Sequence, residues 1–171
     1  MFQKGEYVVY GNNGICEIED IANPGFSGVD ENRLYYVLEP VDGSGSRIYS
    51  PVDSKKMKIR RVMSAEEAEQ FIEGIPRVET LWVENEKKRE ESYKVALLTE
   101  EPEEWVKIIK TLYFRGVDRM KQGKKITTTD EKYLRVARER LYSELGFALG
   151  REKEGMENYI KERIEHLEMA E

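Results

Sequence analysis

The most informative part of the sequence is residues 2–14, which read FQKGEYVVYGNNG. The run Tyr7–Tyr10 consists of β-branched and aromatic residues, which favour strands, and glycines bound it on both sides. Four more strand-like runs follow at residues 15–21, 34–38, 47–51 and 57–62, with glycine-rich turns among them. In the second run, alternation predicts that Ile15 points inward and Cys16 outward, whereas the character of a lone thiol in a small barrel predicts that Cys16 is buried and packs in the core. Five short strands in about 60 residues predict a small, strongly bent barrel or SH3-like sheet.

From residue 62 onward the apolar residues recur with a helical period. Ser64 and Glu67 have the spacing of a capping box, so we expect a helix to begin there. The next helix is expected from about Val83 to Leu98, and a later one is expected to be capped at Thr128. Further helices are expected to begin near Pro102 and Met156. The second half is therefore predicted to be a compact five-helix bundle of about 110 residues.

Composition excludes several classes of protein. Cys16 is the only cysteine, which excludes a Cys-rich zinc site. His166 is the only histidine and lies near the C-terminus, so we expect neither a His cluster nor a His-based catalytic triad. The sequence has no Walker or dinucleotide-binding glycine loop. It also lacks an apolar run long enough for a membrane span and a secretory signal at its N-terminus. We therefore expect a non-enzymatic cytoplasmic protein that uses no metal, cofactor or small-molecule substrate.

The charge is unevenly distributed along the chain. The net charge is -6, yet residues 107–140 hold eleven Lys or Arg and only four Asp or Glu, a local net charge of +7. Such a run of cations supplies what phosphate contacts need, because each contact releases counterions. The alternative is an ordinary solvated face that acidic neighbours balance in the fold. Charge alone leaves both interpretations open.

Trp82 and Trp105 have different sequence contexts. Trp105 belongs to the apolar stripe of the third predicted helix, Trp105, Ile108, Ile109, Leu112 and Tyr113, so we expect it in the core. Trp82 precedes a highly charged segment. From the residues alone, a hydrophobic staple that packs Trp82 back on the bundle is favoured over an exposed indole that wedges against an unstacked base step.

Motifs in both halves resemble those of the CarD/CdnL family of bacterial transcription regulators. The opening residues 2–14 are similar to the family's F-x-x-G-[DE]-x-V-V-Y-x-x-x-G start, and Tyr35–Leu38 and Tyr49–Pro51 follow it. In the helical half the resemblance rests on residues 93–94, 112–115, 130–134 and 137–138. The opening motif is also similar to the polymerase-binding module of the transcription-repair coupling factor. The helical half and the lack of helicase motifs separate the two.

The resemblance implies an α+β protein with a Tudor-like RNA polymerase-interacting β-barrel in residues 1–62 and a helical DNA-contacting domain in residues 63–171. It implies docking on the polymerase β subunit, with Arg33, Arg47 and Tyr49 as candidate contacts. The helical domain is then expected to stabilise the promoter open complex at the upstream edge of the bubble, where a Trp enters the minor groove. Arg89 stands where some relatives have that Trp, and Trp82 takes the role here. The candidate DNA contacts are Trp82, Lys88, Arg89, Lys94, Arg115, Arg119, Lys124, Lys125 and Lys132.

Phosphate contacts carry little sequence information, so weak promoter specificity is expected, with the protein reaching the nucleoid through the polymerase. The competing interpretation is a polymerase-binding adaptor without DNA contact, in which the basic run folds against acidic helices. An enzyme is the third and weakest interpretation.

Overall fold

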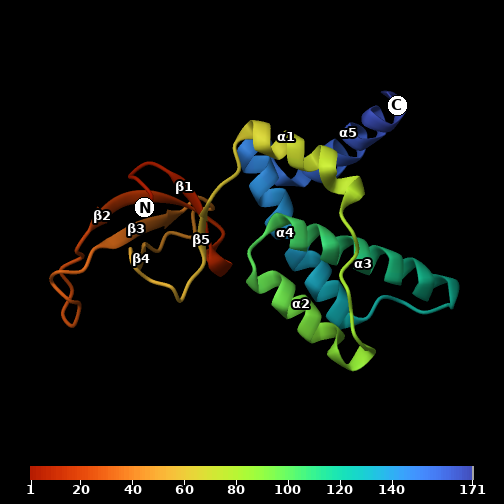
Figure 1. Cartoon of the computed structure of the whole chain (residues 1–171), viewed down its shortest axis with the longest axis horizontal. Coiled ribbons are helices and arrows are strands. Elements are labelled where there is room, and N and C mark those ends of the chain that lie inside the picture. The colour runs from red at the N-terminus through yellow and green to blue at the C-terminus, as the bar shows by residue number, and fades with distance from the viewer. Residues whose placement is uncertain (171) are drawn as a thin grey trace. The chain divides into compact units, whose positions relative to one another are not determined.

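The computed structural model describes residues 1–170, which divide into two compact units, residues 1–62 and residues 63–170. The first unit is an antiparallel β-sheet and the second consists of five helices (Figure 1). The predicted α+β fold class, a small β-domain followed by five helices, is confirmed.

Five strands make up the first unit: β1 (Tyr7–Tyr10), β2 (Ile15–Ala22), β3 (Tyr35–Pro40), β4 (Ile48–Pro51) and β5 (Ile59–Arg61). They pair antiparallel in the order β4-β3-β2-β1-β5, so β4 and β5 are the two edges. The register between β2 and β3 shifts at Ile18 and Asp20, and such an irregularity bends a sheet locally. The strands lie within about one residue of the predicted runs at most of their ends.

The two faces of the sheet are covered by different apolar clusters. The larger cluster consists of Val8, Tyr10, Cys16, Ile18, Tyr36 and Leu38, and the smaller of Val9, Ile15 and Val62. The outward direction that alternation gave Cys16 is therefore wrong, because its side chain is fully buried in the larger cluster, and the prediction that this lone thiol packs in the core is confirmed. Alternation does place Ile15 and Cys16 in separate clusters, but both faces of β2 are covered.

The turn after β1 requires glycine. Gly11 has a φ of +48°, and a Cβ there would lie 2.5 Å from the Met57 sulfur. The turn after β1 therefore passes close to Met57, in the segment that leads to β5.

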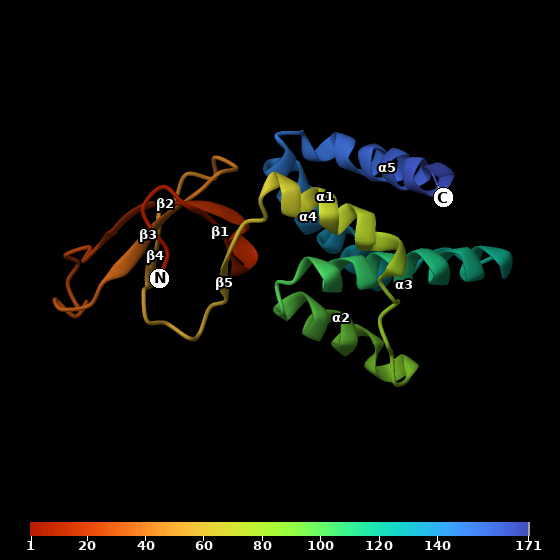
Figure 2. The ribbon, with the colours of Figure 1, turned by 45° about the horizontal axis from the view of Figure 1, so that its top comes forward.

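The helices of the second unit are α1 (Ala65–Gly74), α2 (Arg89–Leu98), α3 (Pro102–Lys121), α4 (Thr128–Leu149) and α5 (Met156–Ala170). Both hydrogen bonds of the capping box at Ser64 and Glu67 are present. α4 lies at the centre and contacts α1, α2, α3 and α5 (Figure 1 and Figure 2). Trp105 is 1% exposed among the core side chains, so the prediction that it belongs to the core is confirmed.

Three details of the helical half differ from the predictions. α2 begins six residues later than expected, because Asn85 caps a short 3-10 turn over Glu86–Lys88 that precedes it. The cap of α4 is Thr127 and not Thr128, since the Thr127 hydroxyl accepts the backbone N–H of Asp130. Tyr113, expected inside, is 60% exposed at the edge of the α3 stripe.

Candidate nucleic-acid interface and sheet edge

Trp82 lies on the extended segment that connects α1 to α2 in the sequence. This segment runs beside α3. The backbone N–H of Leu81 donates to the Thr111 hydroxyl of α3 over 2.7 Å. Lys110 donates to the carbonyls of Ile75 and Val78, 2.6 Å each, and so fixes the start of the segment. The indole of Trp82 is 77% exposed. The staple favoured by the residues alone is therefore absent, and the indole faces solvent.

Several cations of the +7 run hold the fold together. Burial lowers the pKa of Lys110, whose ammonium group satisfies the two backbone carbonyls. Lys107 pairs with Glu104 over 3.0 Å, and Arg140 pairs with the buried Glu100 over 3.0 Å. The balancing by acidic neighbours that charge alone left open is thus realised for part of the run.

Three exposed lysines of the run lie in the turn between α3 and α4 and at the start of α4. Lys124 and Lys125 are exposed in the turn, and the Lys125 carbonyl accepts a hydrogen bond from Arg119 Nε over 2.8 Å. Lys132 is exposed on the first turns of α4, and its ammonium group lies 5.5 Å from the centre of the Tyr133 ring. These lysines can reach a phosphate without breaking the core.

Two candidate lysines near α2 have exposed acidic partners. Lys88 pairs with Glu84 over 3.1 Å, and Lys94 pairs with Glu90 over 3.8 Å. All four side chains are about half exposed. Exposed pairs of this kind contribute about 0–1 kcal/mol, so a phosphate can replace the carboxylate at little cost.

Arg89 and Arg115 form a polar cluster where α2 meets α3 and α4. Arg115 Nε donates to the buried Asp130 carboxylate over 2.6 Å, and its Nη1 donates to Glu86 over 3.0 Å. Arg89 donates to Glu86 and to the Tyr93 hydroxyl. Hydrogen bonds from Arg89, assisted by the charge of Arg115, lower the pKa of Glu86 to about 2. Arg115 is therefore an anchored side chain and not a free cation.

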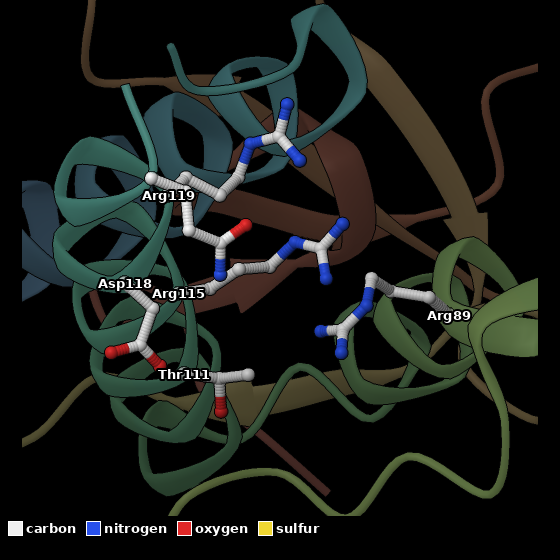
Figure 3. Close-up of a pocket in the computed structure, with 6 residues that line it drawn as sticks. Arg89, Thr111, Arg115, Asp118 and Arg119 are labelled. Carbon is white, nitrogen blue, oxygen red and sulfur yellow. The ribbon is translucent and has the colours of Figure 1, made fainter. Parts of the chain in front are cut away.

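An open pocket of about 370 Å³ lies beside this cluster. It is lined by Arg89, Thr111, Arg115, Asp118, Arg119 and Gln122. Figure 3 shows the guanidinium groups of Arg89 and Arg115 extending toward one another across the space, with Arg119 beside them. Sequence reasoning chose the three arginines but missed Glu86, Tyr93 and Asp130. The Glu86–Arg89 spacing was a readable signal, whereas the contact of Arg115 with Asp130 depends on how the helices pack.

The candidate polymerase contacts of the first unit lie near β3 and β4. Tyr49 is on the edge strand β4, and the Phe26 ring meets it edge-to-face with 5.0 Å between ring centres. Arg47 pairs with Glu19 over 3.0 Å. Arg33 pairs with Asp53 over 3.1 Å, and both border a second open pocket of about 540 Å³.

Sequence reasoning also missed Phe26, which is 53% exposed. Its position in a glycine-rich turn gave no signal of the contact with Tyr49. The turn thus adds an exposed aromatic ring to the edge at β4.

Within residues 1–170 no group of three or more His, Cys, Asp or Glu side chains is arranged to hold a metal ion. None of the helices in the described residues is both long and apolar enough to cross a membrane.

Residues 2–63 match the family model described as the CarD-like/TRCF RID domain. No curated protein matches the chain. The matched segment covers all five strands of the β-unit, and this domain has a Tudor-like fold and is a non-enzymatic module that interacts with RNA polymerase. Residues 2–63 are therefore identified as a CarD-like/TRCF RID domain, which indicates a protein that interacts with RNA polymerase and is related to transcription.

Proposed function

We propose that the protein docks on the RNA polymerase β subunit through its β-unit and stabilises the promoter open complex through its helical unit. The RID domain match supports the polymerase partner, and that partner in turn supports the expected cytoplasmic location. The observation that carries the DNA contact is the 77% exposed indole of Trp82 in a unit that also presents exposed lysines. Exposure of the apolar surface of a Trp to water is unfavourable. A partner that buries this surface gains about 25 cal/mol of binding free energy per Å² of apolar area.

The edge strand β4 supports the docking part of the proposal. An unpaired strand edge can accept a partner strand through backbone hydrogen bonds. Tyr49 lies on this strand, and Arg47 immediately precedes it. Arg33 lies just before the neighbouring strand β3. These three side chains would then set the register and orientation of the added strand.

The DNA part of the proposal uses side chains with two different roles. Trp82 is the wedge, and its indole would stack on a base that becomes accessible where the strands separate at the edge of the bubble. The phosphate contacts are assigned to exposed or weakly paired cations, which are Lys88, Lys94, Lys124, Lys125 and Lys132. Arg89, Arg115 and Arg119 line the neighbouring pocket and supply fixed positive groups.

Stabilisation of the open complex follows from differential affinity. A contact that exists only with melted DNA shifts the population toward the open state by its own free energy. Docking on the polymerase raises the effective concentration of the helical unit at the promoter, which compensates for the net charge of -6. Because phosphates and stacking carry little sequence information, the effect should depend weakly on promoter sequence.

The adaptor without DNA contact is retained as a second candidate because part of the +7 run is paired internally. Lys107, Arg115 and Arg140 all pair with carboxylates of their own unit. In that case the exposed Trp82 would bind a protein surface.

An open-complex dissociation assay with the full chain and RNA polymerase separates the two candidates. The DNA-contact proposal predicts that Lys124→Glu/Lys125→Glu shortens the lifetime of the open complex while polymerase binding stays intact. It also predicts that Arg47→Glu weakens binding to the polymerase. An unchanged lifetime with the double lysine variant, at two salt concentrations, would favour the adaptor.

A further inference from the structure

Glu86 occupies the position between two arginines that an external anion would take. Its Oε1 accepts from Arg89 Nη2 over 2.7 Å, and its Oε2 accepts from Arg89 Nε over 3.0 Å. The same Oε2 accepts from Arg115 Nη1, also over 3.0 Å. Two arginines around two oxygens of one carboxylate is an arrangement that suits a phosphate group equally well.

Both guanidinium groups are also held from the interior of the protein. Arg89 Nη1 donates to the Tyr93 hydroxyl over 3.1 Å, and that hydroxyl donates to Asp130 over 3.1 Å. Arg115 Nε donates to Asp130 over 2.6 Å. Tyr93 and Asp130 are 0% and 2% exposed, so these anchors are fixed by packing. The two arginines therefore keep their positions if Glu86 leaves.

Glu86 lies on the solvent side of the cluster. Its side chain is 67% exposed, and it belongs to a 3-10 turn of three residues before α2. The side chains of Arg89 and Arg115 are only 17% and 24% exposed, so Glu86 is the member of these ion pairs that faces solvent. Solvent screens this contact, and when Glu86 turns away Arg115 keeps Asp130 while Arg89 keeps only the neutral Tyr93 hydroxyl. The Arg89 side chain, which is 17% exposed, then has no carboxylate partner, so an entering anion replaces the lost charge.

The local charge balance gives Glu86 a decisive role. The arginines that line the pocket are Arg89, Arg115 and Arg119, and Asp118 is the one carboxylate among the lining residues. From outside that lining, Asp130 binds Arg115, and Glu86 binds both Arg115 and Arg89. Three positive charges face three negative charges while Glu86 is in place, so an anion gains little by entering. Once Glu86 turns away, the cluster carries a net charge of +1 and has donors that point to open space.

We propose that the pocket lined by Arg89, Arg115 and Arg119 is a phosphate-binding site that Glu86 closes as an internal competitor. This proposal rests on the proposed function, since it adds a regulated phosphate contact to the same DNA-binding unit. The ligand is a phosphate group, which comes either from a nucleic-acid backbone or from a free phosphate compound. Binding exchanges one carboxylate for one phosphate on the same donors.

The test uses the full chain with Glu86→Ala and the matched control Glu84→Ala. Both substitutions remove one exposed acidic side chain from the same segment, but Glu84 pairs with Lys88, which does not line the pocket. Inorganic pyrophosphate is titrated by calorimetry, and a labelled single-stranded oligonucleotide is titrated by fluorescence anisotropy at several salt concentrations. Glu86→Ala/Arg119→Ala is measured beside them, and circular dichroism verifies that each variant is folded.

The proposal predicts that Glu86→Ala binds pyrophosphate about tenfold more tightly than the wild type, the change expected for an added charge-assisted contact. Glu84→Ala should bind pyrophosphate within about twofold of the wild type, because Lys88 does not line the pocket, and the double variant should lose the gain. A gain with the oligonucleotide, together with a salt slope steeper by about 0.7, assigns the site to a nucleic-acid backbone. A gain with pyrophosphate alone assigns it to free phosphate compounds.

Equal affinities of Glu86→Ala and Glu84→Ala for both probes would overturn the proposal. The proposed function fails separately. If the Glu86→Ala gain is present but Trp82→Ala leaves the lifetime of the open complex unchanged, the phosphate site stands and the role in open-complex stabilisation falls.

Discussion

Replacing Asp130 by alanine removes the group on which the α2–α3–α4 junction depends. The Asp130 side chain is 3% exposed and accepts hydrogen bonds from Arg115 over 2.6 Å and from Tyr93 over 3.1 Å. Breaking a buried ion pair by removing one partner costs about 3–5 kcal/mol. Arg115 is 24% exposed and keeps its bond to Glu86, which places the loss near the lower limit, at about 3 kcal/mol.

Urea unfolding followed by tryptophan fluorescence measures this loss in the helical unit alone. Both tryptophans, Trp82 and Trp105, belong to Met63–Glu171, and Trp105 is buried. With a slope of about 1.5 kcal/mol per M, a loss of about 3 kcal/mol lowers the urea midpoint by roughly 2 M. Asp118→Ala is the matched control, because Asp118 is exposed on α3 and its loss should change stability by less than about 0.5 kcal/mol. Equal midpoints for Asp130→Ala and Asp118→Ala would refute the reasoning.

Three further measurements test separate features. Burial, with a smaller contribution from the charge of Asp42, raises the pKa of Cys16 to about 11, so iodoacetamide should alkylate this thiol about 100-fold more slowly in the native chain than in urea at neutral pH; similar rates would contradict its burial. Gly146→Ala should destabilise the helical unit by about 1–3 kcal/mol, because its Cβ would lie 2.8 Å from a backbone carbonyl oxygen. Gly116 has open space around it, so Gly116→Ala should stabilise the unit by about 0.5–1 kcal/mol. Urea midpoints that shift in the same direction for both variants would argue against this packing. Glu86 has a folded pKa of about 2 against 4.5 for the free group, so its ion pairs stabilise the fold above pH 4.5 and this stabilisation is lost as the pH falls toward 2; the unfolding free energy of Glu86→Ala should fall less steeply over that interval, and parallel curves would count against the ion pairs.

Local signals in the sequence were enough to predict the fold class. The alternation of short apolar runs with glycine turns predicted the strands, and the capping box at Ser64 located the first helix. The direction in which each strand side chain points was harder to predict from the sequence. Cys16 was assigned to the wrong side because alternation distinguishes two faces but does not tell that both are covered.

The candidate site shows a different limit of sequence reasoning. Composition identified the basic run, but it could not tell which cations the protein uses for its own fold. Lys110 and Arg115 lie in the same run as Lys124 and Lys125, yet only the last two are exposed. The partners Ile75, Val78 and Asp130 lie 15 to 35 positions away in the sequence, so their contacts follow from helix packing and not from local spacing. For the same reason the exposure of Trp82 could not be predicted from its neighbours.

The lifetime of the polymerase–promoter open complex in the presence of Trp82→Ala tests the central claim most directly. Leu98→Ala is the matched control, because Leu98 is 76% exposed in the same unit and Trp82 is 77% exposed. We expect Trp82→Ala to shorten the lifetime about tenfold, the equivalent of a lost base-stacking contact, while Leu98→Ala matches the wild type and both variants bind polymerase normally. Equal lifetimes for the two variants and the wild type would contradict an account in which this indole holds melted DNA.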